Sequence, residues 1–315
     1  MNDLLPNHAS SHWFNFRRQF LPVLFWIQTI FFCTDAIAQS EAIKHRVYLA
    51  ANTADIGENA KIYAELQAQL AAHPEPFSLI INGDLIAAEL TNENIPADSA
   101  KIRKLLETAA SCVNGKAIII PGDRDWADSG KEGLQSVKQL ERLIAAFDFK
   151  NVQWAIKDGC LGPKAVEFDD NILLITINTQ WRNHPYDKPE PADADCKISV
   201  DENFMEELED LIEENADKNV LISGHFPIFS LGEYGGHLPL KTHLLPLPII
   251  GGFFAGYRQN VSTPKDLANA RFEIFRKRME GLITSRRNLI YLSGHEHNLQ
   301  ILKKITITLN NAAAL

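Results

Sequence analysis

Several features that assign proteins to common functional classes are missing from this sequence. Its four cysteines form no CxxC pair, so a thiolate zinc site is not expected. The GxSxG motif of many serine hydrolases and the GxxxxGK[ST] loop that cradles nucleotide phosphates are also absent. The net charge is -9 and no cluster of Lys and Arg recurs, which excludes a nucleic-acid backbone as an expected partner.

The most apolar run lies near the N-terminus and has the pattern of a secretion signal. Arg17 and Arg18 precede the run at 20–32, and the segment Ala36-Ile37-Ala38 places small residues at positions −3 and −1 of a cleavage site. The alternative is an uncleaved anchor helix, although the run is shorter than the ~20 residues that a membrane span needs.

We therefore predict two parts, with cleavage after Ala38. Residues 1–38 form an N-terminal extension and signal peptide, and residues 39–315 form the exported domain, which is periplasmic, secreted or at the cell surface. No later run is long and apolar enough for a bilayer, so no membrane span is expected after cleavage. The ending LNNAAAL carries no closing structure and leaves open that the chain is a fragment of a longer protein.

An exported compartment permits disulfides, and the cysteines fit this. Cys33 belongs to the predicted signal. Cys160 and Cys196 both lie in loop-like sequence and are candidates for a bridge, whereas Cys112 ends a helical pattern and is expected to be a buried free thiol.

Short apolar runs alternate with helical patterns along most of the chain, which predicts an α/β layered fold with its site at the strand ends. The predicted strands lie at 45–52, 77–81, 116–120, 165–168, 172–178, 220–223, 288–292 and 302–307. The two strands at 165–168 and 172–178 are close enough for an antiparallel pair. Residues 226–260 are rich in Gly and Pro without periodicity, which indicates a long functional loop.

Several predicted strands end in side chains that bind metals. They are Asn52, Asp84, Asp123, His225 and the pair His295 and His297, and four of these strand ends carry a Gly just before the polar residue. A single such residue is more often a turn or a helix cap. Together, oxygen and nitrogen ligands without cysteine favour Mn, Fe or Zn. Two such ions about 3.5–4 Å apart clamp a phosphoryl group and activate a water.

The motifs NGD (82–84), PGDRDW (121–126), SGHFP (223–227) and GHEH (294–297) resemble, in this order, those of the calcineurin-like metallophosphoesterase superfamily. The resemblance spans about Val47 to Leu302, and GHEHNLQ together with NTQW (178–181) is similar to an exported bacterial branch. It implies an α/β (α+β) fold: a β-sandwich of mixed sheets flanked by α-helices, with the site at the carboxyl ends of the strands.

The resemblance also implies a ligand set for two divalent ions. Asp84 would bridge both ions. Asp123, which stands where the family has Asn, would bind the second ion together with His225 and His295. His297 would bind the first ion opposite Asp84, and Asn52 stands where the family has an Asp ligand for that ion.

Departures from the family pattern weaken the first ion's site and change the catalytic residues. Asn52 offers only a neutral carbonyl oxygen and Ala54 offers no ligand, so we expect one strong and one weaker site, unless Asp55 substitutes. Arg124 replaces a His that protonates the leaving oxygen in the family. An Arg cannot donate that proton, but it can hold phosphate oxygens, and Asp125 could pair with it.

Two functions are compatible with these residues. The first is a metal-dependent phosphoesterase that hydrolyses a phosphate mono- or diester, of a phosphorylated small molecule for example, through a metal-bound hydroxide. The alternative is a catalytically weakened domain that serves as a binding or scaffolding module of a cell-surface protein. The retained Asp84, His225, His295 and His297 favour the first, and the changes at Asn52, Ala54 and Arg124 favour the second.

Overall fold

A computed structural model describes residues 43–57, 59–87, 95–111, 114–189, 196, 201–244 and 248–303. The chain divides into Met1–Ile43 and Lys44–Leu315, and every helix and strand given below belongs to the second part. The predicted signal peptide, its cleavage after Ala38, Cys112 and residues 304–307 of the last predicted strand lie outside the described residues. None of the described helices combines the length and the apolar character that a membrane crossing requires.

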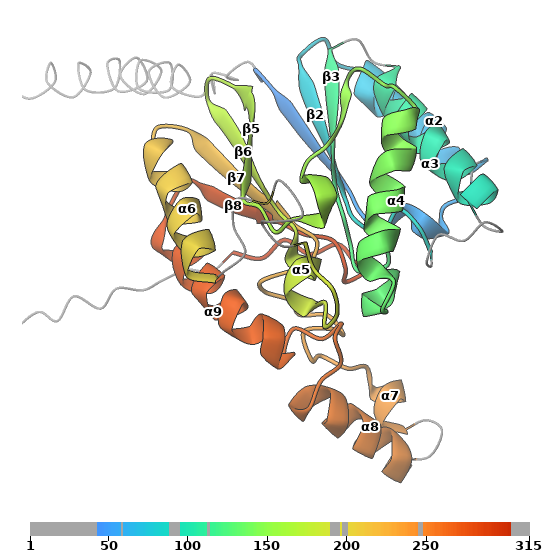
Figure 1. Ribbon diagram of the computed structural model, residues 1–315, viewed down its shortest axis with the longest axis vertical. Coiled ribbons are helices and arrows are strands. Elements are labelled where there is room, and N and C mark those ends of the chain that lie inside the picture. Colours follow the sequence, from blue (N-terminus) through green and yellow to red (C-terminus); the bar gives the residue numbers. More distant parts are fainter. Residues whose placement is uncertain are drawn as a thin grey trace, which may run out of the picture. The chain divides into compact units, whose positions relative to one another are not determined.

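Two four-stranded sheets form the centre of the domain (Figure 1). In the first sheet all strands are parallel, in the order β1 (Arg46–Ala50), β2 (Phe77–Asn82), β3 (Gly115–Ile120) and β4 (Val152–Trp154). The second sheet has the order β5 (Lys164–Asp169), β6 (Ile172–Ile177), β7 (Asn219–Gly224) and β8 (Leu289–Leu292). Here β5 and β6 are antiparallel, as their close spacing predicts, and the other pairs are parallel.

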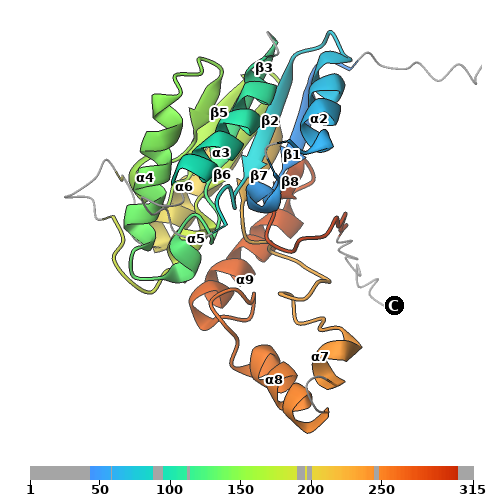
Figure 2. The ribbon, with the colours of Figure 1, turned by 90° about the vertical axis from the view of Figure 1, so that its right-hand side faces the viewer.

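Helices cover the outer faces of both sheets, so the predicted α/β architecture of helix-flanked sheets is confirmed at this level (Figures 1 and 2). On the first sheet lie α2 (Lys61–Ala71), α3 (Ile95–Ala110) and α4 (Gly133–Ala146). On the second lie α6 (Asp201–Glu214) and α9 (Ala270–Ser285). Parallel strands require such crossover helices, because a short turn cannot return the chain to the start of the next strand.

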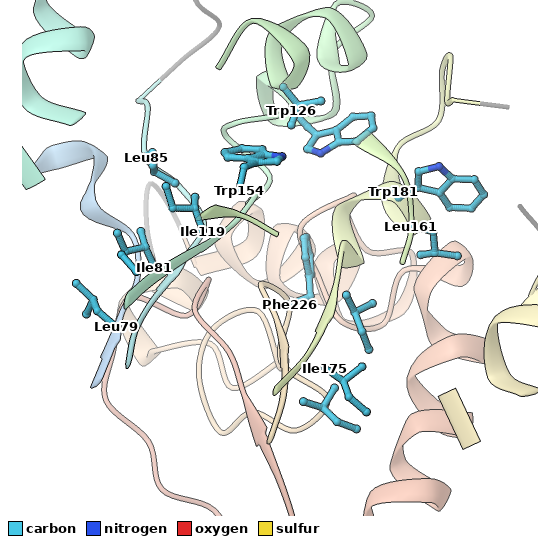
Figure 3. Packing of buried hydrophobic residues seen from close by; sticks show 14 of the residues in the cluster. Leu79, Ile81, Leu85, Ile119, Trp126, Trp154, Leu161, Ile175, Trp181 and Phe226 are labelled. Atoms are coloured by element: carbon cyan, nitrogen blue, oxygen red, sulfur yellow. The ribbon is translucent and has the colours of Figure 1, made fainter. Parts of the chain in front are cut away.

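The inner strands β2, β3, β6 and β7 are apolar and buried on both faces, because both sides of each sheet are covered there. In β2, Leu79 and Ile81 belong to a large cluster with residues of the helices, while Ile80 packs in a smaller cluster with residues of β3, β6 and β7. This alternation follows from the two-residue period of a strand. Figure 3 shows part of the large cluster, in which Trp126 and Phe226 extend the apolar packing toward the ends of the strands.

The segment at 226–260 differs from the expected loop, because it contains two helices, α7 (Leu240–Leu244) and α8 (Pro248–Asn260). Glycine-rich sequence is a poor helix former, which is why the pattern predicted none. Close packing of α7 against α8 requires glycine at position 251, because a Cβ there would lie 2.6 Å from the Thr242 carbonyl oxygen. The short helix α5 (Thr179–Asn183) and strand β4 were also not expected.

The candidate bridge between Cys160 and Cys196 is confirmed as a disulfide. It closes a 36-residue separation and ties the segment after α5 to the start of β5. A covalent link of this kind restricts the unfolded chain more than the folded one and so stabilises the domain.

Truncation of the central strand should destabilise the domain strongly. Ile81 is fully buried, and Ile81→Ala should lower the free energy of unfolding by about 2–5 kcal/mol, because it removes apolar contacts and leaves a cavity. Ile274→Ala is the matched control, because that side chain on α9 is 67% exposed and its loss should change stability by about 0.5 kcal/mol at most. Urea unfolding measures both, and equal effects would contradict this account of the core.

Candidate metal centre

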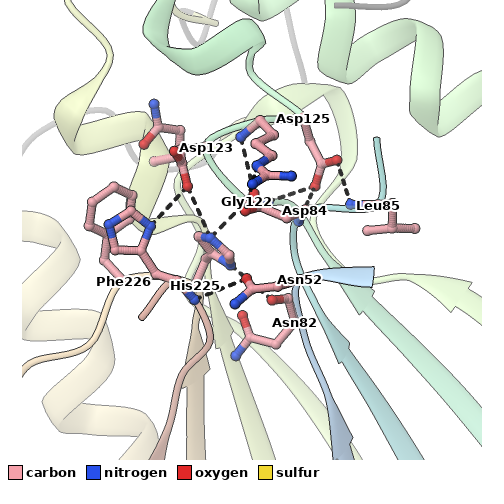
Figure 4. Close-up of polar contacts among 12 residues, drawn as sticks. Asn52, Asn82, Asp84, Leu85, Gly122, Asp123, Asp125, His225 and Phe226 are labelled. Atoms are coloured by element: carbon pink, nitrogen blue, oxygen red, sulfur yellow. Dashed lines mark hydrogen bonds and ion pairs between the residues drawn. The ribbon is translucent and has the colours of Figure 1, made fainter. Parts of the chain in front are cut away.

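Four predicted ligands follow neighbouring strands at one edge of the two sheets. His225 directly follows β7. The other three, Asp84, Asp123 and His295, lie two or three residues after the ends of β2, β3 and β8. Parallel strands bring their carboxyl ends to the same edge, which is where the sites of α/β folds form. Figure 4 shows Asp84, Asp123 and His225 pointing toward a common point above the strands.

Asn82 joins the two sheets beneath this point. It is fully buried at the end of β2, and its amide nitrogen lies 2.9 Å from Ser223 Oγ, 3.2 Å from the Gly224 carbonyl and 3.2 Å from the Leu292 carbonyl. One side chain of the first sheet thus donates to the ends of β7 and β8 in the second. This contact fixes the spacing of the strand ends from which the ligands project.

Glycines let the loops after the strands approach one another. A Cβ on Gly122 would lie 2.4 Å from Asp84 Oδ1, and a Cβ on Gly83 would lie 2.3 Å from His225 Nδ1. A Cβ on Gly294 would lie 2.7 Å from the Ala51 Cβ. Real Cβ atoms do not pack at such distances, so close approach requires glycine at these positions, and the left-handed backbone of Gly83, with φ of 75°, also favours glycine.

Asp123, His225 and His295 form a cluster that could hold a metal ion. One ligand atom from each lies within 4.8 Å of the others, and all three residues are buried. Asp123 Oδ1 is 3.1 Å from His225 Nε2 and 3.0 Å from His295 Nδ1. A carboxylate and two imidazoles suit a borderline divalent cation.

The ring nitrogen of each histidine that faces away from Asp123 contacts a backbone carbonyl, and this contact fixes the orientation of the imidazole. His225 Nδ1 lies 2.8 Å from the Asn82 carbonyl oxygen, and His295 Nε2 lies 2.8 Å from the Lys265 carbonyl oxygen. A carbonyl only accepts, so both nitrogens must donate. If the imidazoles are neutral, the other nitrogen of each turns its lone pair toward Asp123, and a cation between them would satisfy both groups. The backbone carbonyls serve as the outer contacts that metal-binding histidines use, so the residues fit a metal.

Electrostatics around the cluster agree with a site built for positive charge. Burial lowers the pKa of His225, but the charge of Asp84 and the hydrogen bond with Asp123 raise it more, so its pKa lies well above the ordinary value. Burial raises the pKa of Asp123, yet the neighbouring His295 and His225 lower it more, so its pKa lies well below the ordinary value. Without a metal, a proton on the His225 imidazole would compensate the neighbouring carboxylates.

Asp84 lies next to the cluster and points its two oxygens in different directions. Its Oδ1 is 3.3 Å from His225 Nε2 and accepts a hydrogen bond from the Arg124 backbone N–H at 3.1 Å. Its Oδ2 is 3.6 Å from Arg124 Nε. The carboxylate thus connects the imidazole side of the site with a guanidinium, and at 1% exposure it has almost no contact with water.

Arg124 forms the second contact of its guanidinium with Asp55, at 2.9 Å. Burial lowers the pKa of Arg124, but the hydrogen bond to Asp55 and the charges of Asp84 and Asp55 raise it more, so the net pKa is above the ordinary value. The sequence offers Asp55 as a substitute ligand for the first ion. In the structure the Asp55 carboxylate pairs with the Arg124 guanidinium instead.

Asp125 holds backbone rather than Arg124. Its fully buried carboxylate accepts hydrogen bonds from the N–H groups of Gly122 (2.8 Å), Asp84 (3.0 Å), Leu85 (2.9 Å) and Ile86 (3.2 Å) (Figure 4). Burial and the charge of Asp84 raise the pKa of Asp125 to about 7. The expected pairing of Asp125 with Arg124 is replaced by these bonds, which fasten the two ligand loops together.

The two residues expected at the first ion are placed differently from the cluster. Asn52 has a left-handed backbone with φ of 54°, and its Oδ1 accepts a hydrogen bond from the His295 N–H at 3.1 Å. Its carbonyl oxygen therefore supports a ligand. His297 is exposed, and its ring lies outside the cluster found among the described residues.

Two contacts of the site were not anticipated. Lys265 lies in the loop before α9, and its Nζ is 3.5 Å from Asp123 Oδ2 and 2.7 Å from Asp128 Oδ1. Nothing in the local sequence marks it, because only the tertiary fold brings it to β3. Glu296, inside the GHEH motif, accepts hydrogen bonds from Ser230 Oγ (2.5 Å) and the Gly235 N–H (2.9 Å), so it anchors the segment that leads to α7.

This geometry can bind one divalent cation and places two basic side chains beside it. No protein-family model matches the chain, and no curated protein matches it at a significant level. The chemistry of the site therefore has to be inferred from its residues and their contacts.

A buried histidine near the site should also make stability depend on pH. His184 follows α5, has no exposed surface and packs against Trp126 in a tilted arrangement, with ring centroids 4.9 Å apart. Neither of its ring nitrogens has a hydrogen-bond partner within the described part of the chain. Burial, followed by the charge of Lys188, lowers the pKa of His184 from 6.5 to about 4.

Gly122→Ala should disrupt the site and destabilise the domain by about 1–3 kcal/mol, because the added methyl group would meet Asp84 Oδ1 and, at 2.5 Å, the Asp84 backbone nitrogen. Gly281→Ala is the matched control, since a Cβ on this helical glycine meets nothing within 4 Å and should stabilise α9 by up to about 1 kcal/mol. Urea unfolding of the two variants tests this. Loss of stability in neither variant would contradict the close approach.

Stability should fall as the pH drops from 6.5 toward 4. In that window the unfolded chain protonates His184 and the folded chain does not, so this residue contributes a slope of up to about 1.4 kcal/mol per pH unit. The contribution of the neutral, buried His184 to stability is fully present above pH 6.5. His184→Gln should show a smaller slope than the original chain in urea unfolding between pH 7 and pH 5, with His237→Gln in an exposed loop as control. An unchanged slope in His184→Gln would refute the assignment.

Proposed function

We propose that this chain is a metal-dependent phosphoesterase of the calcineurin-like superfamily, which hydrolyses a phosphate mono- or diester. The observation that carries the proposal is the buried cluster of Asp123, His225 and His295, whose imidazoles are oriented toward the carboxylate by backbone carbonyls. The order of the motifs along the chain and the helix-flanked sheets support the same family.

The residues of the chain have distinct tasks in this reaction. A divalent cation at the cluster supplies Lewis-acid polarisation of a phosphoryl oxygen and lowers the pKa of a water. Asp123, His225 and His295 hold it, and Asn52 and Lys265 hold His295 through its backbone and its ring. Arg124, with 20% of its side chain exposed, can donate to phosphate oxygens and stabilise the charge that develops on them.

The absence of a proton donor at position 124 sets the kind of ester that reacts well. The oxygen of a water molecule bonds to phosphorus and its proton passes to solvent, the P–O bond to the leaving group breaks, and the leaving oxygen takes a proton or departs as an anion. Arg124 stays protonated and cannot provide that proton. The leaving group therefore receives it from water, which favours substrates with acidic leaving groups such as phenols or phosphates.

Export of the domain is part of the proposal. The sequence pattern before Ala38 predicts it, and the disulfide between Cys160 and Cys196 supports an oxidising compartment. The substrate would then be a phosphorylated molecule in the periplasm or outside the cell.

A second candidate is a binding or scaffolding domain. It is favoured by the apolar side chains that α7 and α8 expose, among them Leu240 at 72% and Phe253 at 78%. It is also compatible with the pairing of Arg124 with Asp84, which occupies a residue that a two-ion enzyme needs.

Removal of a cluster ligand should abolish both metal binding and hydrolysis. After incubation with Mn²⁺ and desalting, the purified chain should retain one ion by elemental analysis and hydrolyse bis-p-nitrophenyl phosphate or p-nitrophenyl phosphate. His225→Ala and His295→Ala should weaken metal affinity by roughly 100-fold or more. His237→Ala, in an exposed loop, is the control.

The outcomes separate the two candidates. Metal retained in His225→Ala would refute the cluster as the metal site. One ion bound without turnover of either ester would refute the phosphoesterase and leave the binding module.

A further inference from the structure

We propose that the Arg124 guanidinium takes the place of the first metal ion, so that a fixed cation and one exchangeable ion lie on opposite sides of Asp84. The inference rests on the proposed function, and it concerns the part of the site where the residues do not fit a metal. In this arrangement the site holds one metal ion and one permanent positive charge, in place of one strongly bound and one weakly bound ion.

The two oxygens of Asp84 carry the argument. Oδ1 faces the cluster, 3.3 Å from His225 Nε2, while Oδ2 faces the guanidinium, 3.6 Å from Arg124 Nε. A carboxylate that bridges two ions would present its oxygens in the same way, one to each cation. Here one of those cations is a side chain of the protein.

Asp55 completes the surroundings of the guanidinium. Arg124 Nη1 lies 2.9 Å from Asp55 Oδ2, so the positive charge sits between the carboxylates of Asp55 and Asp84. Asp55 is the only acidic residue of the one-turn helix Thr53–Asp55, which directly follows Asn52. A metal ion at the first position would need the same pair of carboxylates.

The other ligands expected at the first ion are not directed to it. Asn52 uses its carbonyl oxygen to accept from the His295 N–H. Ala54 is buried, has no ligand atom in its side chain, and donates its N–H to the Asp84 carbonyl oxygen at 2.8 Å. His297 is exposed and outside the cluster. Without these ligands a hydrated cation would have to displace Arg124 to reach Asp84.

The charge balance explains why an arginine is suited to this role. Asp84 is 1% exposed, and a buried carboxylate without a compensating charge is strongly unfavourable. Arg124 remains protonated at any working pH and needs no free metal in the medium. Because its side chain is partly exposed, the same guanidinium can receive a phosphate oxygen.

Metal stoichiometry in Arg124 variants tests the inference directly. The purified chain, stripped with chelator and titrated with MnCl₂ in a calorimeter, should bind one ion. Arg124→Ala and Arg124→Gln remove the fixed charge and leave Asp55 and Asp84 free, so each should bind a second ion, more weakly than the first. Arg124→Lys keeps a cation and should remain at one ion.

Two controls accompany these variants. Arg286→Ala removes a surface arginine that pairs with Glu213 at 2.8 Å, and it should remain at one ion. The double variant Asp84→Asn with Arg124→Ala should also stay at one, because the second ion needs the Asp84 carboxylate. Circular dichroism confirms that each variant is folded, and the Ala and Gln variants serve as replacements for each other.

The results distinguish failure of the inference from failure of the proposed function. Two ions in the original chain, or one ion in every folded Arg124 variant, would overturn the guanidinium as a substitute for the first metal. No ion in the original chain would instead refute the cluster as a metal site, and the inference with it.

Discussion

The compensation of two buried carboxylates is the constraint on which the rest of this site depends. Asp84 and Asp123 lie at the ends of adjacent parallel strands and are almost fully buried, at 1% and 2% exposure. Two neighbouring negative charges that are poorly solvated repel each other strongly unless cations lie between them. Two imidazoles, a lysine and an arginine surround the pair, and each reaches it from a different part of the chain.

The backbone is shaped to bring those charges together. Gly83, Gly122 and Gly294 remove the side chains that would keep the loops apart, and Asp125 fastens two of the loops by accepting four backbone N–H groups. Asn82 joins the two sheets by donating from its amide nitrogen to Ser223 Oγ and to the Leu292 carbonyl oxygen. Because Asp125 acts on backbone, it is a positioning residue and need not touch substrate. The polar side chains beneath the site therefore hold ligand geometry, while the apolar layers hold the sheets.

Sequence reasoning works where a residue's local surroundings decide its structure. Except for β4, the strands of both sheets are visible as short apolar runs, and the glycine before Asp84, Asp123 and His225 correctly marks the strand ends. It fails where a distant partner decides. Nothing near Arg124 indicates that its partners are Asp55 and Asp84, and Lys265 reaches Asp123 only through the fold. The helix α8 escapes prediction because its glycines have low helix propensity, and the close approach of Gly251 to the Thr242 carbonyl oxygen is visible only in the fold.

Arg124 also links the site's electrostatics to its chemistry. A protein that replaces a proton-donating histidine by arginine loses general-acid assistance, which is worth roughly 100- to 10,000-fold in rate. The Arg124 guanidinium also supplies a positive charge that no chelator can remove, and this charge lies against the Asp84 carboxylate. Lost proton transfer matters least for esters whose leaving group is stable as an anion. Under the proposed function, Arg124 would therefore narrow the range of esters that react well and would remove the need for a second ion, so the residue at position 124 would influence which class of ester the site can hydrolyse.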